Sequence, residues 1–291
     1  MSPRETTFVK GHGTGNDFVV ITNLEGEVDV TPSLVRALCD RRRGIGGDGV
    51  LVVARTADHP EVSDQAEMAP YFMDYRNADG SLAQMCGNGA RVFAAHLVAT
   101  QLAGAGSFQI ATRGGPRRVV VDPSVGQVVV DMGPAMFLEG TDITVRTGQG
   151  GSETGRPAVG VLMPNPHAVT WVDAVADAGD LREKPIVAPA DVFPDGVNSE
   201  FVELVTDLHI RMRVFERGVG ETLSCGTGAC AAAVATLRRQ GVAADGQRVR
   251  VDVPGGTVAV LWRADGGVEL SGPAEFVARG TVDRDWWQRH G

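Results

Sequence analysis

Two nearly uninterrupted apolar runs rich in alanine are the most prominent hydrophobic feature of the chain. One runs from Arg91 to Leu102 and the other from Cys230 to Arg238. Both are of helical length, and a helix that is apolar on nearly every side must be buried all round. The pattern therefore predicts two buried helices, one in each half of the chain.

Shorter apolar or alternating stretches on either side of these helices predict strands. In the first half they cover residues 6–10, 17–22, 50–54, 70–75, 107–111, 117–121 and 127–131. In the second half they cover residues 143–146, 159–163, 168–172, 201–206, 208–215, 248–253, 257–262, 267–271 and 275–281. We therefore expect an α+β protein in which each half is an antiparallel, curled and barrel-like sheet around one central apolar helix.

Polar and glycine-rich segments predict the connections. Residues 11–16 contain too much glycine for a helix, and residues 55–68 are polar without a period, so both are expected to be loops. Residues 174–195 form a second long loop, and residues 133–156 are expected to cross into the second half. Thr31-Pro32 predicts the start of a further helix that Gly44 ends, with Cys39 inside it as a packing residue.

Each apolar helix is preceded by a cysteine in a nearly identical context. The two segments are Cys86-Gly87-Asn88-Gly89-Ala90 and Cys225-Gly226-Thr227-Gly228-Ala229. The free N–H groups and the positive dipole end of a helix start favour a thiolate or a bound carboxylate. Core packing explains one buried cysteine equally well. Two matching contexts predict paired chemistry on one small acid.

Composition narrows the class of protein. With 43% hydrophobic and 22% charged residues in 291, the chain is typical of a soluble globular protein. A net charge of −9 argues against nucleic acid as a partner. No apolar run approaches the ~20 residues of a membrane helix, and the first residues lack a signal-peptide core, so we expect a cytoplasmic protein with no membrane partner.

Two cofactor motifs are absent or out of context. Residues 44–49 match G-x-G-x-x-G but follow a helix and precede a strand, the reverse of a dinucleotide site. A pyridoxal cofactor needs a Schiff-base lysine, and Lys10 and Lys184 lie in no such motif. We therefore expect no cofactor and no metal.

Suppose that the two helix starts meet at one cleft. The carboxylate of an amino acid could then lie between both positive ends, with its α-carbon between the two sulfurs. One sulfur, as thiolate, would remove the α-proton while the other, as thiol, delivers a proton to the opposite face. The product would have the mirror configuration at that carbon.

Six motifs carry a resemblance to a known family. They are His12-Gly-Thr-Gly-Asn-Asp-Phe18, Asn77-Ala-Asp-Gly-Ser81, Cys86-Gly-Asn-Gly-Ala-Arg91, Asn165-Pro-His167, Glu216-Arg217-Gly218 and Cys225-Gly-Thr-Gly-Ala-Cys230. Together, and in this order, they resemble diaminopimelate epimerase. The resemblance implies interconversion of LL- and meso-2,6-diaminopimelate without cofactor or metal, in lysine and peptidoglycan-precursor biosynthesis.

The resemblance also implies an organisation into two pseudosymmetric domains with the active site in the cleft between them. Residues 1–130 would form the N-terminal half and residues 131–272 the C-terminal half. The tail, residues 273–291, would pack back on the first half.

The family's functional residues fall on matching positions of this chain. The proton pair falls on Cys86 and Cys225. The implied substrate contacts are the side chains of Asn16, Asn77, Asn165, Asn198, Glu216 and Arg217 and the backbone of Gly87, Asn88, Gly226 and Thr227. Arg217 suits the distal carboxylate, whereas Glu216 and the asparagines suit ammonium groups. His167 is implied as a supporting residue, although Asn16 and His167 are also ordinary turn residues.

Three other functions stay open at this point. A racemase of the proline racemase type would also pair two cysteines, but it has no second zwitterionic end to bind. A zinc or redox thiol protein is the second, although the chain has no C-x-x-C. The third is a binding protein without chemistry. The sequence leaves a homodimer open as well.

Overall fold

The computed structural model describes residues 6–148, 155–244 and 246–291. The chain divides into two compact units: unit 1 comprises Met1–Val130 and Pro273–Gly291, and unit 2 comprises Asp131–Gly272. Two strands, β7 (Gln127–Pro134) and β18 (Gly267–Pro273), run through the boundaries of this division. Each unit is described by itself below.

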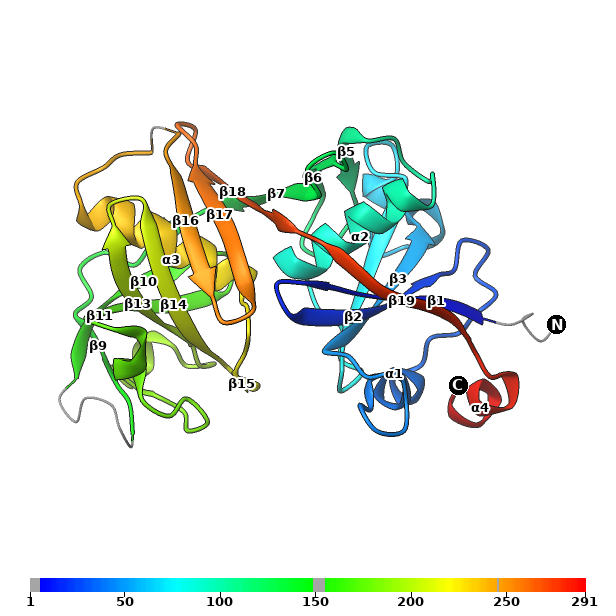
Figure 1. Cartoon of the computed structure of the whole chain (residues 1–291), viewed down its shortest axis with the longest axis horizontal. Coiled ribbons are helices and arrows are strands. Elements are labelled where there is room, and N and C mark those ends of the chain that lie inside the picture. Colours follow the sequence, from blue (N-terminus) through cyan, green and yellow to red (C-terminus); the bar gives the residue numbers. More distant parts are fainter. Residues whose placement is uncertain (1–5, 149–154, 245) are drawn as a thin grey trace. The chain divides into compact units, whose positions relative to one another are not determined.

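Unit 1 is built on a sheet of five described strands in the order β19-β1-β2-β3-β4. Their bounds are β1 (Thr6–Gly13), β2 (Asn16–Thr22), β3 (Gly49–Arg55), β4 (Tyr71–Asn77) and β19 (Glu275–Val282). A second, antiparallel set contains β5 (Gly106–Ile110), β6 (Arg117–Asp122) and β7. The buried helix α2 (Gly87–Ala99) contacts β1 to β4 and β6, so it lies inside the unit (Figure 1).

Residues 11–16 are not the loop that the glycines predict. β1 continues to Gly13, and only Thr14 and Gly15, both with positive φ, form the turn into β2. The glycines allow close approach instead: a Cβ at Gly11 would lie 3.2 Å from Val92 on α2, and one at Gly13 only 2.8 Å from the Arg91 guanidinium. The turn places Asn16 at the first position of β2.

Helix α1 (Pro32–Cys39) begins as predicted and ends earlier. The Thr31 hydroxyl caps it by accepting the Leu34 N–H at 3.2 Å. The predicted extension to Gly44 is wrong, because the N–H groups of Ile45 and Gly46 already bind the Leu38 carbonyl and close the helix end. Cys39 lies in the apolar core of unit 1, which confirms that it is a packing residue.

One predicted loop needs correction, and one helix was not expected from the sequence. Residues 55–68 contain two short 3-10 turns, Thr56–Asp58 and Ser63–Gln65, and Val62 and Gln65 are buried rather than exposed. The Gln65 side chain binds both backbone groups of Thr112, which fastens this segment to the unit. The C-terminal helix α4 (Arg284–His290) was not predicted; it packs beside α1 and buries Trp287 in the same core (Figure 1).

Unit 2 has its described strands in the order β12-β9-β10-β11-β13-β14-β16-β17-β18. Their bounds are β8 (Met136–Phe137), β9 (Ile143–Arg146), β10 (Arg156–Leu162), β11 (Pro166–Val172), β12 (Ile186–Ala188), β13 (Asn198–Thr206), β14 (His209–Glu216), β15 (Gly220–Glu221), β16 (Arg248–Val253) and β17 (Gly256–Trp262). These strands surround helix α3 (Gly226–Arg239) (Figure 1). The predicted loop over residues 174–195 contains β12 and two 3-10 turns, Val175–Ala178 and Ala190–Val192. Part of the predicted crossover, residues 149–154, lies outside the described residues.

The two units repeat one succession of elements. A hairpin (β1-β2 or β10-β11) is followed by a parallel partner (β3 or β13), an antiparallel strand (β4 or β14), a cysteine and the buried helix. This confirms the predicted α+β class and the pseudosymmetry. The sheets are mixed rather than purely antiparallel, because the connections β2-α1-β3 and β11 to β13 cross over. They also keep free edges, so the described strands form no closed barrel.

The described helices include none that is long and apolar enough to cross a lipid bilayer.

Candidate active site

Cys86 and Cys225 are the N-cap residues of the two buried helices, as the sequence predicts. Both have extended backbone angles, and each sulfur accepts a backbone N–H from the first helical turn at 3.4 Å, from Gly89 and Gly228 respectively. The sulfurs therefore take the place that a serine or aspartate oxygen occupies in an ordinary cap. Both thiols lie where the helix dipole is positive.

The Cys86 half-site is held together by amide groups. The Cys86 thiol lies 3.6 Å from the Asn16 Oδ1 atom, which also accepts the Asn88 Nδ2–H at 3.2 Å. The opposite end of the Asn16 amide donates to the Asp48 carboxylate at 2.8 Å. Asp48 thus orients the amide so that its oxygen faces the sulfur.

A buried arginine fastens helix α2 to the turn before β2. Arg91 donates to the Thr14 hydroxyl at 3.1 Å and to the Asn88 Oδ1 atom at 2.8 Å, and its side chain has no solvent exposure. The Thr14 turn and Asn88 are consequently fixed relative to the same helical turn. This sets the position of Asn16 beside Cys86.

An ion-pair cluster supports the same half-site from outside. Arg41 binds the carboxylates of Asp17 and Asp48, each at 2.7 Å, and Lys10 binds Asp17 at 2.6 Å. Burial by itself would raise the pKa of Asp17, but the hydrogen bonds from Arg41 and Lys10 outweigh it and hold that pKa well below its usual range. Asp17 is therefore ionised at neutral pH, and Lys10 is engaged with it.

The Cys225 half-site is held by a chain of side chains. The sulfur lies 3.5 Å from the Thr227 hydroxyl, which accepts the Asn165 Nδ2–H at 3.3 Å. The Asn165 Oδ1 atom lies 3.2 Å from the Nε2 atom of His167, and the Nδ1 atom of His167 lies 2.6 Å from the Glu200 carboxylate. The implied supporting residue His167 is thus linked to Cys225 through two other side chains.

The charge state of Cys225 differs from the expectation. Burial, with only 5% of the residue exposed, raises the pKa of the Cys225 thiol well above its ordinary value, and the nearby carboxylates of Glu216 and Glu200 raise it further. The hydrogen bonds from Thr227 and Gly228 oppose this but do not outweigh it. Burial and the two carboxylates therefore disfavour the Cys225 thiolate, which opposes the effect expected of the helix start.

Glu216 lies at the end of β14, next to this half-site. Burial raises the pKa of its carboxyl group, while hydrogen bonds from Thr222 and Cys225 lower it. The following residue, Arg217, has an exposed side chain and donates its backbone N–H to the Asn198 Oδ1 atom at 2.9 Å. The buried Asn198 therefore holds the Glu216-Arg217 link in place.

The implied site residues gather in two groups, one in each unit. In unit 1 the structure brings Cys86, Asn88 and Asn16 together, whereas Asn77 closes its own turn by donating to the Ser81 hydroxyl at 3.0 Å. In unit 2 it brings Cys225, Thr227, Asn165 and His167 together, with Glu216 beside them. Among the described residues no group of three or more His, Cys, Asp or Glu side chains is arranged to hold a metal ion.

The sequence reasoning missed several residues that support these groups: Thr14, Asp48, Arg91, Glu200 and Thr222. Glu200 had a detectable signal. It stands two positions after Asn198 in a strand, and residues two apart lie on one face of a strand. If Asn198 faces the site, a carboxylate at position 200 faces the interior beside it.

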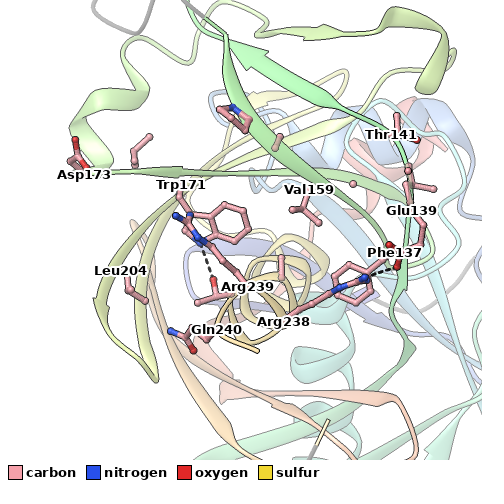
Figure 2. Close-up of a pocket in the computed structure, with 18 residues that line it drawn as sticks. Phe137, Glu139, Thr141, Val159, Trp171, Asp173, Leu204, Arg238, Arg239 and Gln240 are labelled. Carbon is pink, nitrogen blue, oxygen red and sulfur yellow. Dashed lines mark hydrogen bonds and ion pairs between the residues drawn. The ribbon is translucent and has the colours of Figure 1, made fainter. Parts of the chain in front are cut away.

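A cavity of unit 2 lies away from Cys225. It has a volume of about 970 Å³ and surrounds the C-terminal end of α3, the end opposite to Cys225 (Figure 2). Two arginines at its wall are already engaged: Arg238 stacks on Phe137 and binds Glu139 at 2.6 Å, and Arg239 stacks on Trp171. None of the implied site residues lines this cavity, so we assign the chemistry to the half-sites.

Comparison with solved structures defines the class of fold. The chain superposes with a TM-score of 0.69 on a phenazine biosynthesis protein of the PhzF family from Bacillus anthracis, covering 97% of this chain and 100% of that chain at 15% sequence identity. It superposes with a TM-score of 0.66 on a probable proline racemase from Agrobacterium radiobacter K84, covering 96% and 93% at 17% identity. At these identities the likeness concerns the fold, which is shared along the whole chain.

Sequence comparison defines the family within that fold. The family model described as diaminopimelate epimerase matches residues 8–138 and 159–277. The diaminopimelate epimerase of Streptomyces coelicolor is 51% identical over 283 residues, 96% of each chain, and that of Mycolicibacterium smegmatis is 45% identical over 297 residues, 96% of this chain and 98% of the relative. The chain therefore belongs to the diaminopimelate epimerase family, and so to the isomerases.

Proposed function

We propose that this protein interconverts LL- and meso-2,6-diaminopimelate without a cofactor, with one cysteine from each unit acting on the same α-carbon. The observation that carries the proposal is the duplicated half-site. In a chain of this family, both units place a thiol at the N-cap of a buried helix, where each sulfur accepts an N–H at 3.4 Å. Units 1 and 2 would thus be the two halves of the epimerase.

The proposed reaction moves one proton off the α-carbon and another onto it. The thiolate of one cysteine takes the α-proton, so that a C–H bond breaks and an S–H bond forms. The thiol of the other cysteine gives its proton to the opposite face, so that its S–H bond breaks and the new C–H bond forms. The roles of the two sulfurs exchange in the reverse direction.

The carbanion between these two steps needs stabilisation because its charge spreads only into the carboxylate. Backbone N–H groups at the two helix starts, from Gly87, Asn88, Gly226 and Thr227, suit that carboxylate. A Schiff-base route has little support from the lysines: the Lys10 ammonium is bound to Asp17, and Lys184 is exposed outside the helices and strands. The substrate's own carboxylate and these N–H groups therefore take the place of a cofactor.

The second amino acid end of the substrate would bind beside Cys225. The exposed Arg217 guanidinium can take the distal carboxylate in a bidentate contact. Glu216 and the amides of Asn16, Asn77 and Asn165 suit the ammonium groups. Asn198 would act mainly through its hydrogen bond to the Arg217 backbone, at 2.9 Å. We place the reaction in the cytoplasm, in the synthesis of lysine and peptidoglycan precursors.

The test is incubation of the purified protein with LL-diaminopimelate and separation of the stereoisomers. We expect the same equilibrium mixture of LL- and meso-diaminopimelate whichever of the two is supplied. We expect no racemisation of L-proline under the same conditions. Racemisation of proline without action on diaminopimelate would assign the protein to the other class of two-cysteine enzymes. Binding of diaminopimelate without any change of configuration would make it a binding protein.

A further inference from the structure

A buried acid and a buried histidine face each other behind Cys225. His167 and Glu200 both have no solvent exposure, and the His167 Nδ1 atom lies 2.6 Å from the Glu200 Oε1 atom. Glu200 also lies against the first turn of α3, because a Cβ added at Gly228 would be 2.7 Å from its Oε1 atom and 3.3 Å from the Cys225 sulfur. The pair thus lies directly beneath the thiol.

Polar contacts through Asn165 and Thr227 join the pair to the sulfur. The Glu200 carboxylate lies 2.6 Å from the Nδ1 atom of His167, and the Asn165 Oδ1 atom lies 3.2 Å from its Nε2 atom. Both ring nitrogens therefore face oxygen atoms of other side chains, and each can donate a hydrogen bond to its oxygen when it carries hydrogen. The other end of the Asn165 amide donates to Thr227, whose hydroxyl hydrogen is then free to point at Cys225.

Packing alone does not explain such a pair. The equivalent positions of unit 1 hold Phe18, two residues after Asn16, and Leu51, two residues after Gly49, and both are buried against Gly89. The same scaffold is therefore filled by apolar side chains in the other unit. A buried ion pair is commonly no more stabilising than well-packed apolar residues of similar volume, so its presence calls for a chemical reason.

We propose that Glu200 is a positioning residue of the epimerase: its carboxylate holds His167 with both ring nitrogens protonated, so that His167, Asn165 and Thr227 direct hydrogen-bond donors at the Cys225 thiolate. The proposal rests on the proposed function for its catalytic consequence. Glu200 itself touches neither the sulfur's proton nor the substrate and acts through His167.

The charged and titratable groups that face Cys225 come from three strands of unit 2. They are His167 on β11, Glu200 on β13 and Glu216 on β14. If Glu200 acted only as a nearby negative charge, its removal would make the Cys225 thiolate easier to form. If it acts through His167, its removal also removes the positive charge and the aligned donors, and the thiolate becomes harder to form. The two interpretations predict opposite signs.

The first experiment observes His167 directly. Protein labelled with ¹⁵N-histidine is examined by NMR near neutral pH, and the His167 ring signals are identified by their loss in His167→Gln. We expect both ring nitrogens to be protonated in the wild type and one of them to lose its proton in Glu200→Gln. The matched control is Glu203→Gln, which removes a carboxylate from the same strand that binds Arg211 at 3.0 Å instead. It should leave the His167 signals unchanged.

The second experiment measures the Cys225 thiolate and turnover. The rate of alkylation of Cys225 by iodoacetamide, followed by peptide mass spectrometry across pH, should shift to higher pH in Glu200→Gln and not in Glu203→Gln. By analogy with other residues that orient a histidine, Glu200→Gln should lower kcat about 10- to 100-fold with a smaller change in KM. Glu200→Asp, which keeps the charge, should recover part of the lost activity.

Several results would overturn the proposal. They are a neutral His167 ring in the wild type, faster Cys225 alkylation at low pH in Glu200→Gln, or an unchanged kcat in that variant. Because the NMR and alkylation readouts need no turnover, they test the role of Glu200 even if the wild type fails to epimerise diaminopimelate. That failure would instead contradict the proposed function.

Discussion

The two half-sites share the same arrangement of strand, cysteine and helix, and they differ in the side chains that pack beneath the first turn of the helix. In both units a cysteine caps a buried helix, a glycine three residues later donates its N–H to the sulfur, and an asparagine at the start of a hairpin strand lies nearby. Beneath the first turn of the helix, unit 1 places Phe18 and Leu51, whereas unit 2 places His167 and Glu200. The repeated fold therefore gives both thiols the same position in their units but surrounds them with different side chains.

The difference shows that one scaffold can hold two thiols in different surroundings. Cys86 is partly exposed and faces an amide oxygen, which accepts the hydrogen of a thiol. Cys225 is buried among carboxylates and needs compensation before it can ionise. In the proposed mechanism, the two sulfurs that exchange the roles of acid and base would thus depend on different supporting groups.

The largest expected effect comes from removing either sulfur. Cys86→Ala and Cys225→Ala should each lower the rate of epimerisation by at least about 100-fold, because a positioned acid or base contributes that much and each face of the α-carbon needs its own. Stereoisomer analysis of the product measures this. Retention of more than about a tenth of the activity in either variant would contradict the assignment of two bases.

Replacing His167 and Glu200 by the residue types that unit 1 has at the matching positions separates an effect on stability from an effect on activity. In the double variant His167→Phe and Glu200→Leu, the free energy of unfolding should be unchanged or higher by up to about 4 kcal/mol, because apolar residues replace a buried pair of ionisable side chains. Activity should fall about 10- to 100-fold. Denaturant titration and kcat measure the two effects. A less stable but fully active variant would mean that the pair serves the fold and not the chemistry.

Gly89 and Gly228, the third residues of α2 and α3, should lose different amounts of stability when replaced by alanine. In Gly228→Ala the new Cβ would meet Glu200 Oε1 at 2.7 Å and Cys225 Sγ at 3.3 Å, whereas in Gly89→Ala its nearest neighbours would be Leu51 at 3.3 Å and Phe18 at 3.5 Å. We expect Gly228→Ala to cost about 1 to 3 kcal/mol. Gly89→Ala should be close to neutral, because the gain of about 1 kcal/mol in helix propensity offsets the tighter packing. Equal melting temperatures for the two variants would argue against the difference between the half-sites.

The smallest effect concerns acid and the ion-pair cluster of unit 1. Arg41 and Lys10 overcome the opposing effect of burial and hold the pKa of Asp17 below its ordinary value. The ionised Asp17 carboxylate therefore contributes fully to the free energy of unfolding above its unfolded-state pKa of about 4. This contribution is lost progressively as pH falls below that value. Asp17→Asn should cost about 1 kcal/mol at neutral pH, discounted for partial exposure, and less near pH 3. Urea titrations at the two pH values test this, and an equal cost at both would contradict it.

Local sequence signals predicted the framework of each half-site. Apolar runs of helical length gave α2 and α3, the cysteine-glycine contexts gave the caps, and Thr31 gave the start of α1. Strand positions followed from alternation. These features depend on residues that are close in sequence, so periodicity and capping chemistry are sufficient to find them.

Features that depend on distant residues could not be predicted. Gly11 and Gly13 suggested a loop because only the structure shows the packing of α2 that requires them inside a strand. The parallel pairs of strands and the helix α4 depend on tertiary packing in the same way. The charge state of Cys225 depends on Glu200 and Glu216, which are 25 and 9 residues away from it (225 minus 200 and 225 minus 216) and reach the sulfur only through the fold.

The most direct test of the central claim follows the hydrogen on the α-carbon. The wild-type protein is incubated briefly with LL-diaminopimelate in heavy water, and deuterium is measured separately in the first meso product and in the recovered LL substrate. Two cysteines on opposite faces predict one deuterium at the inverted α-carbon of the product, delivered by the second thiol, and little or none in the recovered substrate. A first product that retains the original hydrogen at that carbon would contradict the account.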